Sequence, residues 1–211
     1  MIVVFDLDGT LIDSHNLHAH ILTKILMDYG VTRKIERIDL SSTSLKLFLM
    51  KILPPGLWKD MDEICARYMG EFSKNAHKIS LMPGAIEALE QVREKKAVFT
   101  AMPRKVAETA LKAAGIKRYF EVVVTGDDVE RTKPDPEGLM LIAEELGDHR
   151  LVVVGNGEND IRAAKNFGAV SVFFSPKGET HRDADFNIKD LRELPALVEN
   201  IRLSNRRFFK L

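Results

Sequence analysis

Five short runs of apolar residues recur along the chain, and each is nearly continuous rather than alternating between apolar and polar positions. They are "MIVVF" (1–5), "AVFT" (97–100), "EVVVT" (121–125), "LVVVG" (151–155) and "VSVFF" (170–174). Continuous runs rich in Val, Ile and Phe are typical of strands that are buried on both faces of a parallel sheet. The pattern therefore predicts a parallel sheet built from these runs.

Amphipathic segments lie between several of the predicted strands. The segments that end before Gly115, Gly147 and Gly168 repeat apolar residues at helical spacing. A glycine directly after such a segment favours termination of a helix. Alternation of strands and helices predicts an α/β fold with a doubly wound, Rossmann-like sheet.

Residues 14–80 interrupt this alternation, because they contain no strand-like run. Their apolar spacing instead predicts helices at about 15–29, 41–53 and 59–76. A helical segment inserted directly after the first strand indicates two units. We predict an α/β core formed by residues 1–13 and 81–211, and a small helical cap formed by residues 14–80.

Composition limits the partners and the location of the protein. The 211 residues carry no net charge, so no electrostatic footprint for nucleic acid or an anionic membrane is expected. Cys65 is the only cysteine, which fits a reducing, cytoplasmic setting. The N-terminus does not resemble a signal peptide, and no apolar run is long enough to span a membrane. We expect a monomer or a dimer.

The use of polar residues is uneven. Gln91 is the only glutamine, whereas Lys, Arg and Glu are abundant. Such a bias is found in hyperthermophile proteins. A thermophilic source is one interpretation, and random variation in composition is the other.

Candidate chemistry lies at the carboxyl ends of the predicted strands, where open α/β sheets bind ligands. The first strand runs into "DLDGT", in which Asp6 and Asp8 share a face of the extended chain. Two carboxylates this close repel each other unless a cation or a proton separates them. A helix cap and a turn would account for one of the two acids at most.

Three further polar residues follow other predicted strands: Thr100, Lys133 in "KPDP", and Asp160 in "GNGEND". Each is a weak signal alone, because threonine is common in strands and most lysines are solvated. Their order is informative, since parallel strands would bring all of them to one crevice. Lysine is a point charge suited to a phosphate group.

With these motifs the whole chain resembles the haloacid dehalogenase (HAD) superfamily of phosphohydrolases, and its tail is similar to that of phosphoglycolate-phosphatase-like members. "DLDGT" is similar to the first motif of the family, Thr100 to the second, Lys133 to the third and Asp160 to the fourth. The helical segment 14–80 matches the position of the first type of cap in that family. The resemblance implies a Mg²⁺-dependent phosphatase that acts on a small phosphorylated metabolite such as phosphoglycolate.

The resemblance also implies roles for individual residues. Asp6 would be the nucleophile, and Asp8 would be the general acid and base. Thr100, the backbone of Ala101 and Lys133 would hold the phosphate. Mg²⁺ would be held by Asp6, the backbone carbonyl of Asp8, Asn156 and Asp160.

The sequence departs from the family pattern at Asn156, where the fourth motif commonly has an aspartate. An amide oxygen is still a hard ligand, but it carries no charge, so metal affinity should fall and Asp160 could become the principal acidic ligand. Arg104 either shapes the substrate pocket or begins a helix on the surface, and the second interpretation is favoured. His15, His18 and His20 could form a metal cluster, although cap-helix residues are the favoured interpretation.

Two other functions remain open from the sequence. One is a phosphosugar mutase or another phosphotransferase on the same scaffold. The other is a non-catalytic protein that binds a phosphorylated ligand and has lost activity through the change at Asn156. The second is opposed by the retention of Asp6, Asp8, Thr100, Lys133 and Asp160, because a site without activity has little reason to keep all five.

Overall fold

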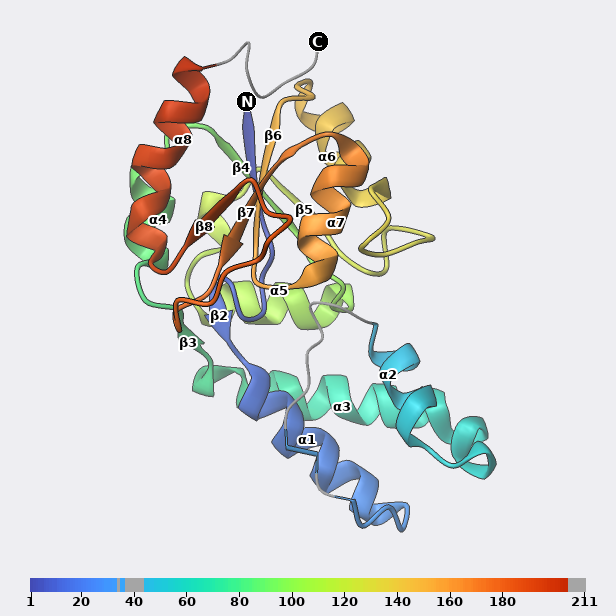
Figure 1. Ribbon diagram of the computed structural model, residues 1–211. Coiled ribbons are helices and arrows are strands. Elements are labelled where there is room, and N and C mark those ends of the chain that lie inside the picture. Colours follow the sequence, from blue (N-terminus) through green and yellow to red (C-terminus); the bar gives the residue numbers. More distant parts are fainter. Residues whose placement is uncertain (34, 37–43, 205–211) are drawn as a thin grey trace.

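The computed structural model describes residues 1–33, 35–36 and 44–204 of the chain (Figure 1). A six-stranded sheet forms its centre, in the order β5-β4-β1-β6-β7-β8, and all neighbouring strands are parallel. The strands are β1 (Ile2–Phe5), β4 (Lys95–Phe99), β5 (Val122–Val124), β6 (Leu151–Gly155), β7 (Val170–Phe174) and β8 (Phe186–Ile188). The predicted α/β fold with a parallel sheet is confirmed.

Helices cover both faces of this sheet (Figure 1). One face carries α4 (Ala85–Gln91), α5 (Arg104–Ala113) and α8 (Leu194–Leu203), and the other carries α6 (Glu137–Leu146) and α7 (Glu158–Phe167). Within β1, Val3 and Phe5 belong to the first hydrophobic core, and Ile2 and Val4 belong to the second. Successive strand residues point to opposite faces, so a strand covered on both sides has to be apolar throughout.

The sequence predicts five of the six strands, and β8 was missed. It has three residues at the edge of the sheet, and only Ile188 among them is fully buried. A run as short as "FNI", with a polar residue at its centre, does not stand out as a buried strand.

A group of helices lies beyond the carboxyl ends of the strands (Figure 1). These are α1 (His15–Asp28), α2 (Leu45–Ile52) and α3 (Met61–Asn75). Short 3₁₀ turns occur at η1 (Pro55–Asp60), η2 (Ala76–Lys78), η3 (Lys117–Tyr119) and η4 (Leu191–Glu193). The first three residues of the helix predicted at 41–53 lie outside the described residues. No helix in the described part of the chain has both the length and the apolar character to cross a bilayer.

A small antiparallel ribbon joins the two places where the chain passes between the sheet and this group of helices. It pairs β2 (Ile12–Asp13) with β3 (Ser80–Leu81). The division into a core of residues 1–13 and 81–211 and a cap of residues 14–80 stays a prediction. β2 ends at the first of its boundaries, and β3 spans the second.

The order of the strands defines where a ligand can bind. From β1 the chain builds outward through β4 and β5, and it then crosses to β6, β7 and β8 on the opposite side. This reversal beside β1 opens a crevice at the carboxyl ends of the central strands, which is where doubly wound sheets bind their ligands.

Candidate active site

The side chains predicted from the strand ends meet at this crevice. Asp6 directly follows β1, and its carboxylate is 1% exposed. Lys133 reaches the same point from the loop between β5 and α6 and is equally buried. Asp160 is contributed by the first turn of α7, after β6. Residues separated by more than a hundred positions in the sequence thus form one polar cluster in an otherwise apolar sheet.

Lys133 is the centre of this cluster. Its ammonium group donates one hydrogen bond to Asp6 Oδ1 and another to Asp160 Oδ1, each 2.6 Å long. Burial lowers the pKa of Lys133, but the charges of Asp160 and Asp6 raise it by more. Burial raises the pKa of Asp6 to about 8, an effect that Lys133 opposes and Asp160 strengthens. The lysine therefore stays charged beside a carboxylate that an approaching cation would help to ionise.

Asp160 is held on both of its oxygens. Besides accepting from Lys133, it accepts a hydrogen bond of 3.0 Å on Oδ2 from the backbone N–H of Gly157, which caps α7. A Cβ atom on Gly155 would lie 2.3 Å from the carboxyl carbon of Asp160. The glycine at the end of β6 therefore leaves the space that this carboxylate occupies.

Thr10 links Asp6 to Asn156. Its hydroxyl lies 3.3 Å from Asp6 Oδ2 and 3.1 Å from Asn156 Oδ1. The preceding Gly9 has a φ of 84°, and a Cβ atom there would lie 2.5 Å from the Asn156 amide nitrogen. Thr10 closes the "DLDGT" motif, but no role was predicted for it.

Asp8 faces a different set of partners, at the start of α1. Its Oδ1 accepts a hydrogen bond of 2.6 Å from the Ser14 hydroxyl. Its Oδ2 lies 3.3 Å from Nε2 of His18 and 3.5 Å from Nδ1 of His15. Burial raises the pKa of Asp8, but the contacts with His18, His15 and Ser14 lower it by more, so it lies below its ordinary value. These contacts therefore favour the ionised form of Asp8.

Two of the three histidines on α1, His15 and His18, thus contact the Asp8 carboxylate. No group of three or more His, Cys, Asp or Glu side chains is arranged to hold a metal ion within the described ranges. His15 and His18 are buried helix residues, as the favoured interpretation had them, but both contact Asp8. Their spacing of three positions, directly after Ser14, was the signal in the sequence.

Thr100 and Ala101 lie at the end of β4 and are buried. The Thr100 hydroxyl accepts a hydrogen bond of 3.2 Å from the backbone N–H of Met102. Arg104 begins α5 and pairs with Asp128, as expected for a residue that starts a surface helix. The Arg104 guanidinium therefore contacts Asp128, in the loop after β5, and not Asp6.

The oxygen atoms at this end of the sheet fit a divalent cation. Because one hydroxyl group contacts both Asp6 Oδ2 and Asn156 Oδ1, these two oxygens lie within reach of a single small ligand. Carboxylate and amide oxygens are the hard donors that Mg²⁺ prefers. With Asn156 in place of an acid, such an ion would depend on Asp6 for most of its charge compensation.

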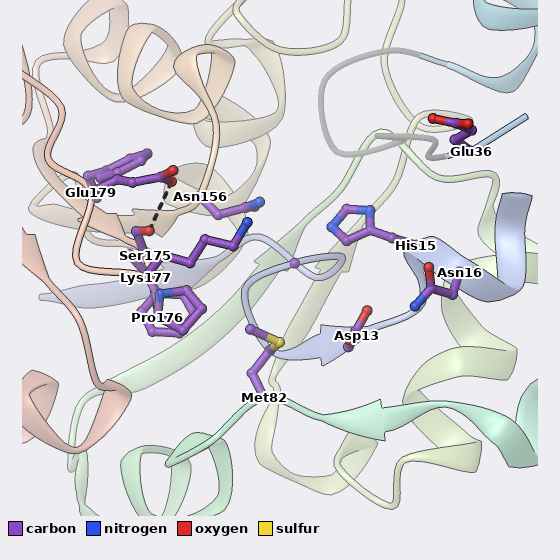
Figure 2. A pocket seen from close by; sticks show the side chains of 13 residues that line it. Asp13, His15, Asn16, Glu36, Met82, Asn156, Ser175, Pro176, Lys177 and Glu179 are labelled. Carbon is purple, nitrogen blue, oxygen red and sulfur yellow. Dashed lines mark hydrogen bonds between the residues drawn. The ribbon is translucent and has the colours of Figure 1, made fainter.

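A cavity of about 400 Å³ opens beside this cluster (Figure 2). Asn156 and Lys177 lie on one side of it and face His15 on the other (Figure 2). Its further polar lining comes from Asp13, Asn16, Glu36, Ser175 and Glu179. Lys177 was missed, although the strand-end argument applied to β7 leads directly to the loop that carries it.

Comparisons with known proteins agree with this architecture. The family model described as haloacid dehalogenase-like hydrolase matches residues 3–174. A phosphorylated carbohydrates phosphatase from Thermotoga maritima is 30% identical over 182 residues, covering 81% of this chain and 83% of its own. A phosphoglycolate phosphatase from Escherichia coli O157:H7 is 31% identical over 201 residues, covering 81% and 79%.

Solved structures share the fold as well. The crystal structure of a predicted phosphoglycolate phosphatase from Haemophilus somnus 129PT superposes with a TM-score of 0.79 at 22% identity. The match covers 93% of this chain and 97% of that one. The chain therefore belongs to the haloacid dehalogenase-like hydrolases, which confirms the predicted family and the prediction of a phosphoric monoester hydrolase.

Proposed function

We propose that this protein is a Mg²⁺-dependent phosphatase that hydrolyses a small phosphorylated metabolite through a phosphoryl group carried on Asp6. The observation that carries the proposal is the pair of buried carboxylates at the end of β1. Asp6 is held by Lys133, and Asp8 is held by the start of α1. Two carboxylates in separate environments can take the separate roles of nucleophile and proton carrier.

In the first step a carboxylate oxygen of Asp6 attacks phosphorus, and the bond between phosphorus and the ester oxygen breaks. Asp8, once protonated, gives its proton to the departing alkoxide, so that a neutral alcohol leaves. In the second step Asp8 takes a proton from water while the water oxygen attacks phosphorus. The bond to Asp6 breaks, and inorganic phosphate and the free carboxylate result.

Charge on the phosphoryl group has to be offset in both steps. Lys133 supplies a fixed positive charge beside Asp6, and the Thr100 hydroxyl and the Ala101 N–H would donate to the non-bridging oxygens. Asp6, the Asp8 carbonyl, Asn156 and Asp160 would hold Mg²⁺, which when bound neutralises charge on the phosphoryl oxygens. Asp160 already accepts from Lys133 and Gly157, so it supports the site as a partner of the lysine as well.

The cavity bears on the substrate. Among the residues that the structure describes, Asp13, Glu36 and Glu179 line it, together with one lysine, Lys177. Carboxylates accept hydrogen bonds from hydroxyl groups and repel other carboxylates. This lining favours a phosphorylated carbohydrate over phosphoglycolate, the substrate that the resemblance suggested.

The single, buried cysteine is consistent with a cytoplasmic enzyme.

The test measures inorganic phosphate released from a phosphorylated carbohydrate and from phosphoglycolate, with Mg²⁺ and with EDTA. We expect Mg²⁺-dependent release, a higher kcat/KM for the carbohydrate, and loss of release in Asp6→Asn. Asp62→Asn, which alters an exposed carboxylate on α3, is the matched control. Release that continued undiminished in Asp6→Asn would overturn the proposal. Transfer of the phosphoryl group to a second sugar, with none released to water, would indicate a mutase instead.

A further inference from the structure

Asp8 is the end of a chain of hydrogen bonds that begins in α3. The Tyr68 hydroxyl lies 2.6 Å from Nδ1 of His18. Nε2 of the same ring lies 3.0 Å from the Ser14 hydroxyl, which donates to Asp8 Oδ1. None of these four side chains is exposed by more than 1%.

The carboxylate fixes the direction of the whole chain. The proton of the Ser14 hydroxyl is used in the bond to Asp8, so Ser14 accepts from Nε2 of His18. A neutral imidazole with its proton on Nε2 has a bare Nδ1, which accepts from the Tyr68 hydroxyl. Every donor therefore points toward Asp8, and Tyr68 selects the tautomer that makes this possible.

The rest of the surroundings hold the imidazole ring in place. His18 stacks on Phe72, with the ring centroids 5.1 Å apart and the planes at 12°. Tyr68 and Phe72 lie four residues apart on α3, so one face of that helix provides both contacts. Packing against Phe72 thus fixes the position of the His18 ring, and the hydrogen bond from Tyr68 fixes its tautomer.

We propose that Tyr68 is a positioning residue for the general acid: it acts through His18 to hold the Asp8 carboxylate in the orientation from which it protonates the leaving group. This inference rests on the proposed phosphatase function. It assigns to α3, far from Asp8 in the sequence, a part in the chemistry at the end of β1.

The leaving group provides a readout that separates positioning from a merely structural role. An alkyl phosphate such as glycerol phosphate has a strongly basic leaving group, so its departure needs the proton from Asp8. p-Nitrophenyl phosphate has a weakly basic leaving group and needs that proton far less. Since kcat/KM reports the first chemical step, a misplaced Asp8 should affect the two substrates unequally.

The experiment compares Tyr68→Phe with the wild-type protein on both substrates. We expect kcat/KM for glycerol phosphate to fall by about tenfold or more, and kcat/KM for p-nitrophenyl phosphate to fall several times less. Tyr29→Phe is the matched control, because it removes an exposed hydroxyl that donates to Glu63 elsewhere in the same group of helices. It should leave the ratio between the two substrates unchanged.

A second variant tests whether Tyr68 acts through His18. In a His18→Leu background, Tyr68→Phe should cause no further loss with glycerol phosphate, because the connection to Asp8 is already absent. Equal losses on the two substrates, no loss, or independent losses in the double variant would each overturn the inference. If the wild-type protein released phosphate from neither ester, the proposed phosphatase function would be wrong. The proposed role of Tyr68 would then be wrong as well.

Discussion

The ammonium group of Lys133 lies 2.6 Å from a carboxylate oxygen of Asp6, and both side chains are 1% exposed. Because the same nitrogen also contacts Asp160, one cation compensates two buried acids. Burial of charges without such compensation is costly. The lysine therefore stabilises the arrangement of the strand ends in addition to any part in binding phosphate.

Replacement of this lysine should destabilise the fold. In Lys133→Met, Asp6 and Asp160 would be left buried without a cation, and we expect the free energy of unfolding to fall by about 3–5 kcal/mol. Urea denaturation monitored by circular dichroism measures the change. Lys46→Met removes a lysine from an exposed pair with Asp62 and should leave the midpoint nearly unchanged. Equal effects of the two variants would contradict this interpretation.

The raised pKa of Asp6 predicts a stability that depends on pH. The unfolded carboxyl group ionises near 3.8, whereas the folded one ionises near 8. Between these values the folded chain binds more protons than the unfolded chain, so the Asp6 contribution to stability declines as pH rises. Asp6→Asn should therefore gain about 3–4 kcal/mol relative to the wild type between pH 5 and pH 8. Denaturation at both values tests this, and a difference that did not grow with pH would contradict it.

Residue 156 should control the affinity for Mg²⁺. Asn156→Asp adds a negative charge beside Asp6, so it should lower the Tm without metal and tighten Mg²⁺ binding by about tenfold, or 1.4 kcal/mol. Thermal denaturation over a Mg²⁺ titration measures both effects. Asn16→Asp adds the same charge elsewhere in the cavity and serves as the control. An unchanged Mg²⁺ dependence in Asn156→Asp would mean that this side chain does not contact the ion.

Two glycine-to-alanine substitutions should change the stability of the fold in opposite directions. Gly155→Ala would push a methyl group to 2.3 Å from the Asp160 carboxyl carbon and should destabilise by about 1–3 kcal/mol. Gly70→Ala, inside α3 with no atom in the way, should stabilise by about 0.5–1 kcal/mol. The denaturation midpoints of the two variants, each compared with that of the wild type, measure these changes in stability. A stable Gly155→Ala would show that Asp160 is not confined by β6.

The sheet and the acidic cluster could be predicted because their signals are local. A strand covered on both faces is apolar at every position, and polar residues at its end stand out for the same reason. Asp6, Lys133 and Asp160 were found in this way, and the structure brings them together.

Other features depend on three-dimensional contacts that no local pattern records. The bond between Tyr68 and His18 joins two helices whose relative rotation depends on side-chain packing, and helical periodicity does not determine that rotation. β8 is short and lies at the edge, so its sequence is under weaker constraint than that of β1. β2 has two residues, which is also too short for a recognisable strand pattern.

The ribbon of β2 and β3 has a consequence for how such a chain can diversify. It holds the two ends of the intervening helical segment one strand spacing apart, about 4.8 Å. A segment whose ends coincide can be lengthened, shortened or exchanged without moving the strands that carry Asp6 and Thr100. The helices between the two strands of the ribbon can therefore change while Asp6 and Thr100 keep their places. The hydrogen bonds that run from Tyr68 through His18 and Ser14 to Asp8 would change with them.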